Sequence, residues 1–298
     1  MEEKAAELAE IITYREFSEK GRNLAIKAGY SPAVEHSEQF VEMTGDDNPI
    51  HRKHPEYHET ISPGLLQNAA AIILINQGIR ESGLNASDFP FSHTKAEMKA
   101  GVVTGLDYVF EIEIGISSEG VLKSSAALSG PQGIVYNLER ASYCKKPKIF
   151  FSRINLLEYI HSCMLIGESP YKFGKLIDSG SPESNLYAVS ASSSVVSDAV
   201  RQGNLNNLEE DVAALYTKQD IYSDARRSLD LKKGLRLFLF LSNPERFGKI
   251  SGAGEILDMN ILAADDNGRV VYLSHAPLAF PRKKIIELQL RKALRLRK

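Results

Sequence analysis

A nearly continuous apolar stretch runs from Gly64 to Gly78, and it is apolar on almost every face. Its length, its alanines, Pro63 before it and Gly78 at its end predict a helix rather than a strand. A helix that is apolar all round must be enclosed by other structure. We therefore expect this segment at the centre of a domain.

Alternating apolar and polar positions, typical of half-buried strands, follow this helix. Turn-forming residues at 118–120 and 130–133 separate them. Upstream, residues 5–26 carry charges among apolar positions and predict a further helix, whereas residues 40–61 are rich in Asp, Asn, Pro and His and predict turns. The first half thus predicts an antiparallel sheet around one buried helix, with strands at 107–115, 121–128 and 134–143.

The second half repeats this order of elements. Residues 186–203 are a small-residue, helix-like segment that ends in Arg-Gln-Gly, as the first helix ends in Asn-Gln-Gly. Self-similarity at the level of elements indicates a duplication. We expect one domain over residues 1–147, a second over 148–281 and a basic tail over 282–298; two unrelated α+β domains are the alternative. The predicted strands of the second half are 217–222, 234–242, 250–263 and 269–279.

Composition narrows the class of protein. The 298 residues suit two domains, and the 43% apolar and 25% charged fractions are average for soluble proteins. A net charge of -2 argues against nucleic-acid binding. No apolar run is long enough to span a bilayer, and the acidic start does not read as a secretory signal. With only Cys144 and Cys163, we expect reduced thiols in a cytoplasmic protein.

Residues 40–51, Phe-Val-Glu-Met-Thr-Gly-Asp-Asp-Asn-Pro-Ile-His, carry the candidate chemistry. Asn48-Pro49 is a tight turn that can point Asp46 and His51 into one pocket. A carboxylate and an imidazole bonded to one water can move its protons, and histidine matches neutral pH. In isolation the stretch is better interpreted as a capped turn with His51 on the surface. The buried helix downstream favours the site.

This stretch resembles the signature of the MaoC-like (R)-specific enoyl-thioester hydratases, an aromatic residue followed by Ser/Thr-Gly-Asp-x-Asn-Pro-x-His. Residues 102–107 are similar to the family's Val-x-x-Gly-Asp turn, with one residue inserted. The resemblance covers residues 40–143 well and the second half only by architecture. The matching positions are Phe40, Thr44, Gly45, Asp46, Asn48, Pro49, Ile50 and His51.

The resemblance implies an α+β double hot-dog fold, in which two antiparallel sheets each wrap around a long central helix and pack as a pseudo-dimer. We find no second copy of the motif, and residues 159–169 stand in its place without Asp or His in register. The second domain is therefore expected to be degenerate and to supply a wall of the acyl tunnel. Its small residues at 191–195 predict that the acyl tail runs there unless another element fills the space.

The implied reaction is the reversible hydration of a trans-2-enoyl thioester to an (R)-3-hydroxyacyl thioester. Asp46 and His51 would activate water, and the backbone N–H of Gly64 at the helix start would bind the thioester oxygen. We expect no metal and no cofactor, with the substrate carried on coenzyme A or acyl carrier protein. The sequence departs from the family pattern at Lys53 and Pro63, which puts the pocket geometry in doubt. The residues expected around the substrate are Asn48, Ser62 and Leu65.

Two rival functions stay open, a non-catalytic acyl-thioester-binding protein and an acyl thioesterase. The basic tail at 282–298 is either a helix docked by one apolar side or a dock for an acidic acyl carrier protein. The chain would be a monomeric pseudo-dimer or a homodimer.

Two other sets of residues rank lower as sites. The histidines of the first half lack a matching set of acidic or thiol ligands for a metal. His161 and Cys163 could form a thiol nucleophile and its base, but residues two apart do not face each other on a helix, so we expect packing. The histidines considered are His51, His54 and His58.

Overall fold

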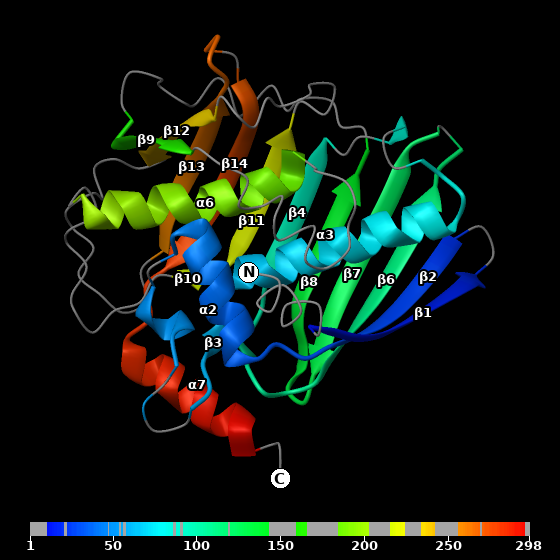
Figure 1. Cartoon of the computed structure of the whole chain (residues 1–298), viewed down its shortest axis with the longest axis horizontal. Helices are drawn as coiled ribbons and strands as arrows, with labels where there is room; N and C mark the ends of the chain where they lie inside the picture. Colours follow the sequence, from blue (N-terminus) through cyan, green and yellow to red (C-terminus); the bar gives the residue numbers. More distant parts are fainter. Residues whose placement is uncertain are drawn as a thin grey trace.

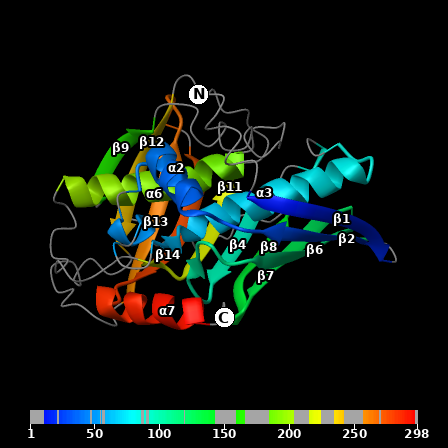
Figure 2. The ribbon, with the colours of Figure 1, turned by 60° about the horizontal axis from the view of Figure 1, so that its bottom comes forward.

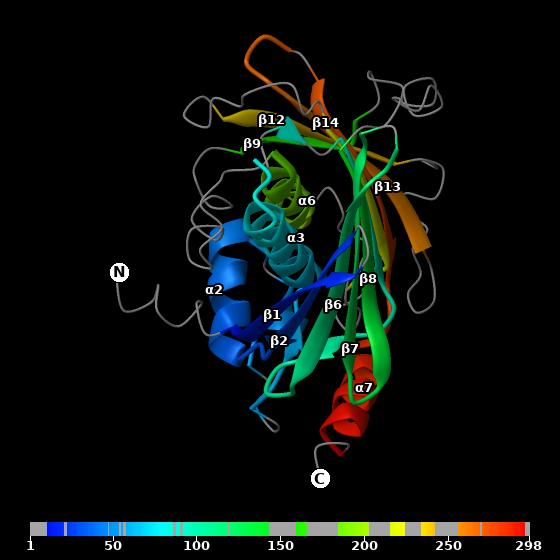
Figure 3. The same ribbon diagram turned by 90° about the vertical axis from the view of Figure 1, so that its right-hand side faces the viewer.

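The computed structural model describes residues 11–20, 23–46, 48–53, 55, 58–85, 88–89, 92–118, 120–142, 159–165, 184–202, 215–223, 234–241, 256–268 and 270–295. Within these residues, the main sheet is antiparallel and has 12 strands (Figure 1). Three helices lie on the same side of this sheet, as the view along it shows (Figure 3). They are α2 (Val34–Thr44), α3 (Gly64–Glu81) and α6 (Ser184–Arg201).

The first half supplies the strands at one end of the sheet and the second half those at the other. The first-half strands are β1 (Ile12–Lys20), β2 (Asn23–Tyr30), β4 (His93–Met98), β6 (Tyr108–Ile116), β7 (Leu122–Gly130) and β8 (Gly133–Ala141), with a small separate pair, β3 (Ile61–Ser62) and β5 (Val102–Val103). The second-half strands are β9 (His161–Leu165), β10 (Leu215–Tyr216), β11 (Lys218–Ser223), β12 (Leu235–Leu241), β13 (Ile256–Ala264) and β14 (Val270–Ala279).

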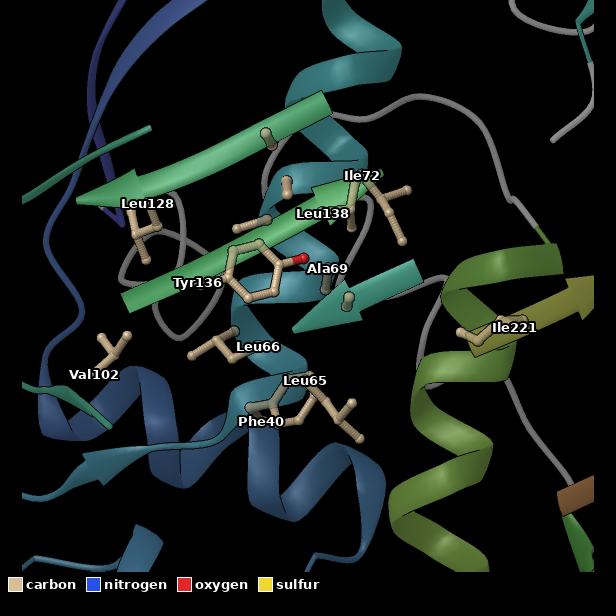
Figure 4. Packing of buried hydrophobic residues seen from close by; sticks show 14 of the residues in the cluster. Phe40, Leu65, Leu66, Ala69, Ile72, Val102, Leu128, Tyr136, Leu138 and Ile221 are labelled. Carbon is tan, nitrogen blue, oxygen red and sulfur yellow. The ribbon is translucent and has the colours of Figure 1, made fainter. Parts of the chain in front are cut away.

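The central helix α3 is enclosed, as its apolar pattern predicts. Every residue from Leu65 to Ile79 is buried. The helix packs so closely on the sheet that a Cβ at Gly78 would lie 2.4 Å from Cδ1 of Ile26 and 2.9 Å from Cδ1 of Ile114. Figure 4 shows part of the core around it, with Tyr136 and Leu138 of β8 next to the helix. The sheet therefore wraps directly onto α3.

Period-two alternation places the apolar side chains of the strands on the helix side. In β6 the buried residues Tyr108, Phe110, Ile112 and Ile114 alternate with exposed or half-exposed ones. The register keeps neighbouring strands in phase, because Phe110 is opposite Leu128 and the next strand continues the pattern. The sheet buries one face against the helices.

The two halves meet at the middle of the sheet, where β4 pairs with β11. The strand order is β1-β2-β6-β7-β8-β4 on one side and β9-β12-β13-β14-β11 on the other, read toward the joint, and β10 pairs with β14 off this path. Each half carries one long helix, and α3 contacts α6. The expected double hot-dog fold is confirmed, with one difference: the two sheets join edge to edge into one. The predicted domain boundary near residue 147 lies outside the described residues.

A buried polar bridge crosses this joint. Asn68 of α3 donates from Nδ2 to Oε1 of Gln219 at 2.7 Å, and Gln219 donates in turn to Oγ of Ser192 at 2.8 Å. Oδ1 of Asn68 accepts a hydrogen bond from the hydroxyl of Tyr136. The first three of these residues are fully buried. The bridge satisfies polar groups that would otherwise oppose association of the halves.

The prediction of a helix over residues 5–26 is wrong. Residues 1–10 lie outside the described part, and β1 and β2 form an antiparallel pair instead. The charged residues of β1 lie on an exposed edge strand, where they discourage pairing with another chain. Their spacing among apolar residues led to the prediction of a helix. In β2 the buried Ile26, Ala28 and Tyr30 recur at period two, which identifies a strand.

Helix α2 was not predicted, because turn-forming residues directly after it dominated the pattern. Its buried positions, such as Val34, Ser37 and Phe40, follow helical spacing. A second correction concerns residues 159–169. Residues 161–165 form β9, which pairs with β12 as β2 pairs with β6. They correspond to β2, so a counterpart of the Asp-His motif would fall in residues 166–183, outside the described residues.

The basic tail forms helix α7 (Lys283–Arg295), which lies at one end of the molecule (Figure 2). Ile286, Leu290 and Ala293 are buried, whereas Ile285 and Leu288 are exposed. The tail is therefore a helix docked by one apolar side, and docking of a carrier protein on its outer face stays a prediction. None of the described helices is long and apolar enough to cross a membrane.

Candidate functional site

The candidate site begins where α2 ends. Gly45 caps the helix in the left-handed conformation, with φ of 71°, and its N–H donates to the carbonyl of Val41 at 2.8 Å. Residues other than glycine rarely adopt this backbone conformation. The glycine of the motif thus stops the helix and turns the chain so that Asp46 follows directly.

Consecutive turns then fix the spacing between Asp46 and His51. Oδ1 of Asp46 accepts a hydrogen bond from the N–H of Asn48 at 3.2 Å. The carbonyl of Asn48 accepts from the N–H of His51 at 3.1 Å, across the short 3₁₀ turn η1 (Pro49–His51). Side chains of Asp and Asn commonly hold turns in this way. The capped turn and the dyad are therefore the same structure, not alternatives.

Asp46 and His51 lie together and are both buried, with 8% and 5% of their surface exposed. Oδ2 of Asp46 lies 3.9 Å from Nε2 of His51, which is too far for a direct hydrogen bond. Nδ1 of His51 lies 2.7 Å from the carbonyl oxygen of Ile61. Because a carbonyl oxygen only accepts, Nδ1 carries a hydrogen, and Nε2 on the other side of the ring faces Asp46.

The strand that orients His51 is itself anchored. β3 pairs with β5 through Ile61 opposite Val103. Thr60, just before it, donates from its hydroxyl to the carbonyl of Ile50, and its N–H donates to the hydroxyl oxygen of Thr104 at 2.8 Å. Thr60 and Thr104 are buried. Hydrogen bonds of Thr60 therefore hold the segment after His51 against the β3–β5 strand pair.

The amino terminus of α3 begins three residues after Ile61. Pro63 precedes the helix and makes no side-chain cap, and its carbonyl accepts from the N–H of Leu66 at 2.9 Å, so no side chain of the cap residue covers the amides of Gly64 and Leu65. A Cβ at Gly64 would lie 3.1 Å from Cγ of Met98. The missing side chain of Gly64 therefore makes room for Met98. Three residues of chain reach about 10 Å at most, so this helix terminus lies near the dyad.

The second half reaches the dyad through α6. The hydroxyl of Ser193 donates to Oδ2 of Asp46 at 3.3 Å, and Ser194 donates to the carbonyl of Thr44. Tyr216 donates to the carbonyl of Ser192 at 2.8 Å. Burial, with the charge of Asp46 adding to it, raises the pKa of Tyr216 well above its usual range. The site thus contains groups from both halves, which no local pattern in the sequence indicated.

The small side chains of α6 lie where this helix packs against other helices. Ala191, Ser192, Ser193 and Val195 are buried, and α6 contacts both α2 and α3. Small residues let helices approach closely. Other elements therefore fill at least part of the space beside residues 191–195, and an acyl tail there stays a prediction.

The residues expected around the substrate have partners within the protein. Asn48 accepts from the N–H of Ile50 at 3.4 Å, so its amide helps to hold the turn. Ser62 accepts from Nε2 of Gln67 at 2.9 Å and is buried. Leu65 belongs to the core. Contact of Asn48, Ser62 or Leu65 with substrate stays a prediction, as do the catalytic roles of Asp46, His51 and Gly64.

The structure gives different outcomes for the two lower-ranked candidate sites, the three histidines of the first half and the pair of His161 and Cys163. Of the three histidines considered as metal ligands, His51 faces Asp46, His58 is exposed, and His54 lies outside the described residues. His161 and Cys163 lie on a strand, not on a helix, so residues two apart share a face and the reason for setting them aside was wrong. Burial, with the charge of Asp198 adding to it, raises the pKa of the Cys163 thiol to about 11. At neutral pH it is a thiol, which is a poor nucleophile.

Comparison with known proteins bears on the fold. No family model matches the sequence, and no curated protein matches it. A solved structure described as a MaoC-like dehydratase is similar, with a TM-score of 0.56 and 10% identity, over 91% of this chain and 99% of that one. The 12:0-ACP thioesterase from Umbellularia californica is similar too, with a TM-score of 0.53 and 10% identity, over 86% of this chain and 94% of the other.

These similarities establish that the chain has the double hot-dog fold over most of its length. Proteins with different printed activities share that fold, so the fold does not decide the reaction. The choice between reactions depends on the site.

Proposed function

We propose that the chain is an enzyme that hydrates trans-2-enoyl thioesters to (R)-3-hydroxyacyl thioesters, and catalyses the reverse dehydration. The observation that supports this most is the geometry of Asp46 and His51, two buried groups that face each other at 3.9 Å without a direct hydrogen bond. The match of residues 40–51 to the hydratase signature points to the same reaction.

The separation of the two groups suits a shared water molecule. Two acceptors that each bind one hydrogen of the same water lie about 4.5 Å apart, close to the 3.9 Å here. Such a water has both hydrogens engaged, and its oxygen lone pairs remain available to attack the β-carbon. His51 is held in the tautomer that this requires by its contact with Ile61.

The proton transfers balance within this arrangement. As the water oxygen bonds to the β-carbon, Nε2 of His51 takes one proton, and the carboxylate of Asp46 stabilises the imidazolium. The dyad then returns a proton to the α-carbon, so that H and OH have been added across the double bond. The hydroxyl of Ser193 holds the carboxylate in place at 3.3 Å. No metal or redox cofactor takes part in these steps.

The thioester oxygen gains negative charge when the β-carbon is attacked, so it needs hydrogen-bond donors. The first amides of α3, beginning with Gly64, are the donors that we propose. They lack a side-chain cap, and the helix dipole favours an anion there. Carriage of the substrate on coenzyme A or on acyl carrier protein is consistent with this reaction, and a cytoplasmic location belongs to the same proposal.

The test is incubation of the full chain with crotonyl-CoA, with the absorbance of the enoyl group and the release of free thiol followed together. A hydratase consumes the double bond without releasing thiol. Release of thiol would instead identify a thioesterase. Binding without either change would identify a non-catalytic acyl-thioester binder, and both of these outcomes would contradict the proposal.

A further inference from the structure

A second cluster of reactive side chains lies at the far edge of the sheet. His161 and Cys163 lie on β9, the last strand of the main sheet, and Asp198 lies on α6, which packs against β9. One ligand atom from each, a ring nitrogen, the sulfur and a carboxylate oxygen, lie within 4.8 Å of one another. We propose that these three residues bind a zinc ion, at a site separate from the Asp46–His51 dyad.

The donor set matches the chemistry of zinc. Zn²⁺ prefers cysteine sulfur, histidine nitrogen and carboxylate oxygen, and three protein ligands are common where the fourth position takes water. In a tetrahedral site the ligand atoms lie about 3.3–3.7 Å apart. Nε2 of His161 and Oδ2 of Asp198 are already 2.8 Å apart, so small side-chain movements suffice. Hard cations such as Mg²⁺ would not select the sulfur.

The position of Arg201 is compatible with the site. Its Nη2 contacts Oδ1 of Asp198 at 3.3 Å, on the other oxygen from the one that faces His161. The Arg201 side chain is 52% exposed, so water screens its charge. The guanidinium therefore orients the carboxylate and leaves Oδ2 for the metal.

Zinc bound here would connect two elements of the second half. It would link the helix α6 to the edge strand β9, and α6 also carries Ser193, which contacts Asp46. A ligand that binds only the folded chain stabilises it. We therefore expect zinc to raise the melting temperature of the full chain.

The test uses Co²⁺ as a spectroscopic probe of the full chain after chelator treatment. The expected result is one Co²⁺ per chain, with the visible bands of a tetrahedral site and a thiolate-to-cobalt charge-transfer band that Zn²⁺ removes by competition. Cys163→Ser should abolish the charge-transfer band, and Asp198→Asn should keep the band but weaken binding at least ~10-fold. Neither readout depends on enoyl hydration, so failure here and failure of the proposed function are distinguishable.

Two variants serve as controls. Cys144→Ser removes the other thiol and should leave the spectrum unchanged. His275→Gln disrupts a histidine–carboxylate pair of similar type, 3.7 Å from Asp258, and should also change nothing. Absence of stoichiometric Co²⁺ binding, a spectrum without the thiolate band, or loss of the band in Cys144→Ser would each overturn the proposal. Wild type and Cys144→Ser decide this even if a ligand variant fails to fold.

Discussion

Two asparagines of α3 allow a direct measurement of what the polar bridge between the halves contributes to stability. Asn68 and Asn76 lie on the same helix, and both are fully buried. Asn68 bonds to Tyr136 and Gln219. Among the described residues, neither polar atom of the Asn76 side chain has a hydrogen-bond partner.

Replacement by alanine removes the same atoms at both positions. Asn68→Ala leaves the hydroxyl of Tyr136 and Oε1 of Gln219 buried without their bonds, at about 1–3 kcal/mol for each unsatisfied group. The expected loss in free energy of unfolding is therefore about 2–6 kcal/mol. Asn76→Ala removes an amide whose burial already costs stability, so a change within about 1 kcal/mol is expected.

Urea unfolding followed by circular dichroism measures both free energies. A double-mutant cycle with Gln219→Ala then isolates the contact across the joint, and contacting pairs typically couple by about 0.5–3 kcal/mol. Equal destabilisation by Asn68→Ala and Asn76→Ala would refute the reasoning, because the variants differ in hydrogen bonding rather than in burial. No coupling between Asn68 and Gln219 would show that the halves are not joined through this bridge.

Three further predictions concern the site and the joint. Gly45→Ala and Gly83→Ala each force alanine into a left-handed conformation in open space. Each variant should therefore lose about 1–2 kcal/mol of stability, and only Gly45→Ala should lower the hydration rate. Ser193→Ala should lower kcat several-fold by releasing Oδ2 of Asp46, and Ser193→Thr should restore it; equal rates in all three proteins would contradict the role. Burial alone would raise the pKa of Asp220, but His93 and Lys218 lower it overall. Its stabilisation is therefore present above about pH 4 and lost as pH falls through the lowered value, so melting temperatures should decline less steeply with acidification in Asp220→Asn than in wild type.

The parts of the fold that could be predicted are those with strong local periodicity. The stretch from Gly64 to Gly78 is apolar on all sides, and an enclosed helix is its simplest solution. Residues 108–116 alternate cleanly because one face of β6 meets that helix. The secondary-structure prediction for residues 12–20 was wrong because β1 is an exposed edge strand, where charged residues replace the alternation that identifies a strand.

The contacts that local patterns cannot reveal are those between distant segments. Ser193 and Asp46 lie 147 residues apart in the sequence, and only the joining of the sheets brings α6 to the motif. His161 and Cys163 were set aside because a helix was assumed where β9 is a strand, and Asp198 was not considered with them. A change of period from 3.6 to 2 reverses which neighbours share a face, and this decides whether the cluster exists.

The spacing between Asp46 and His51 was readable from the sequence because its physical causes are local. Gly45 ends α2, Asn48 holds the turn, and both residues have side chains or backbone conformations suited to that task. The sequence could not predict the distance between the two groups. It also could not predict the contact of His51 with Ile61, which places a hydrogen on Nδ1.

The central claim is that Asp46 and His51 activate water, and it is tested most directly by the rate of crotonyl-CoA hydration in variants of equal fold. Asp46→Asn and His51→Gln should each lower kcat by about 10²–10⁴-fold, the usual contribution of a general acid–base group. The matched controls are Asp258→Asn and His275→Gln, which alter a carboxylate–imidazole pair at 3.7 Å elsewhere in the chain. The account predicts wild-type rates for both controls. Wild-type hydration by either dyad variant, with circular dichroism unchanged, would contradict it.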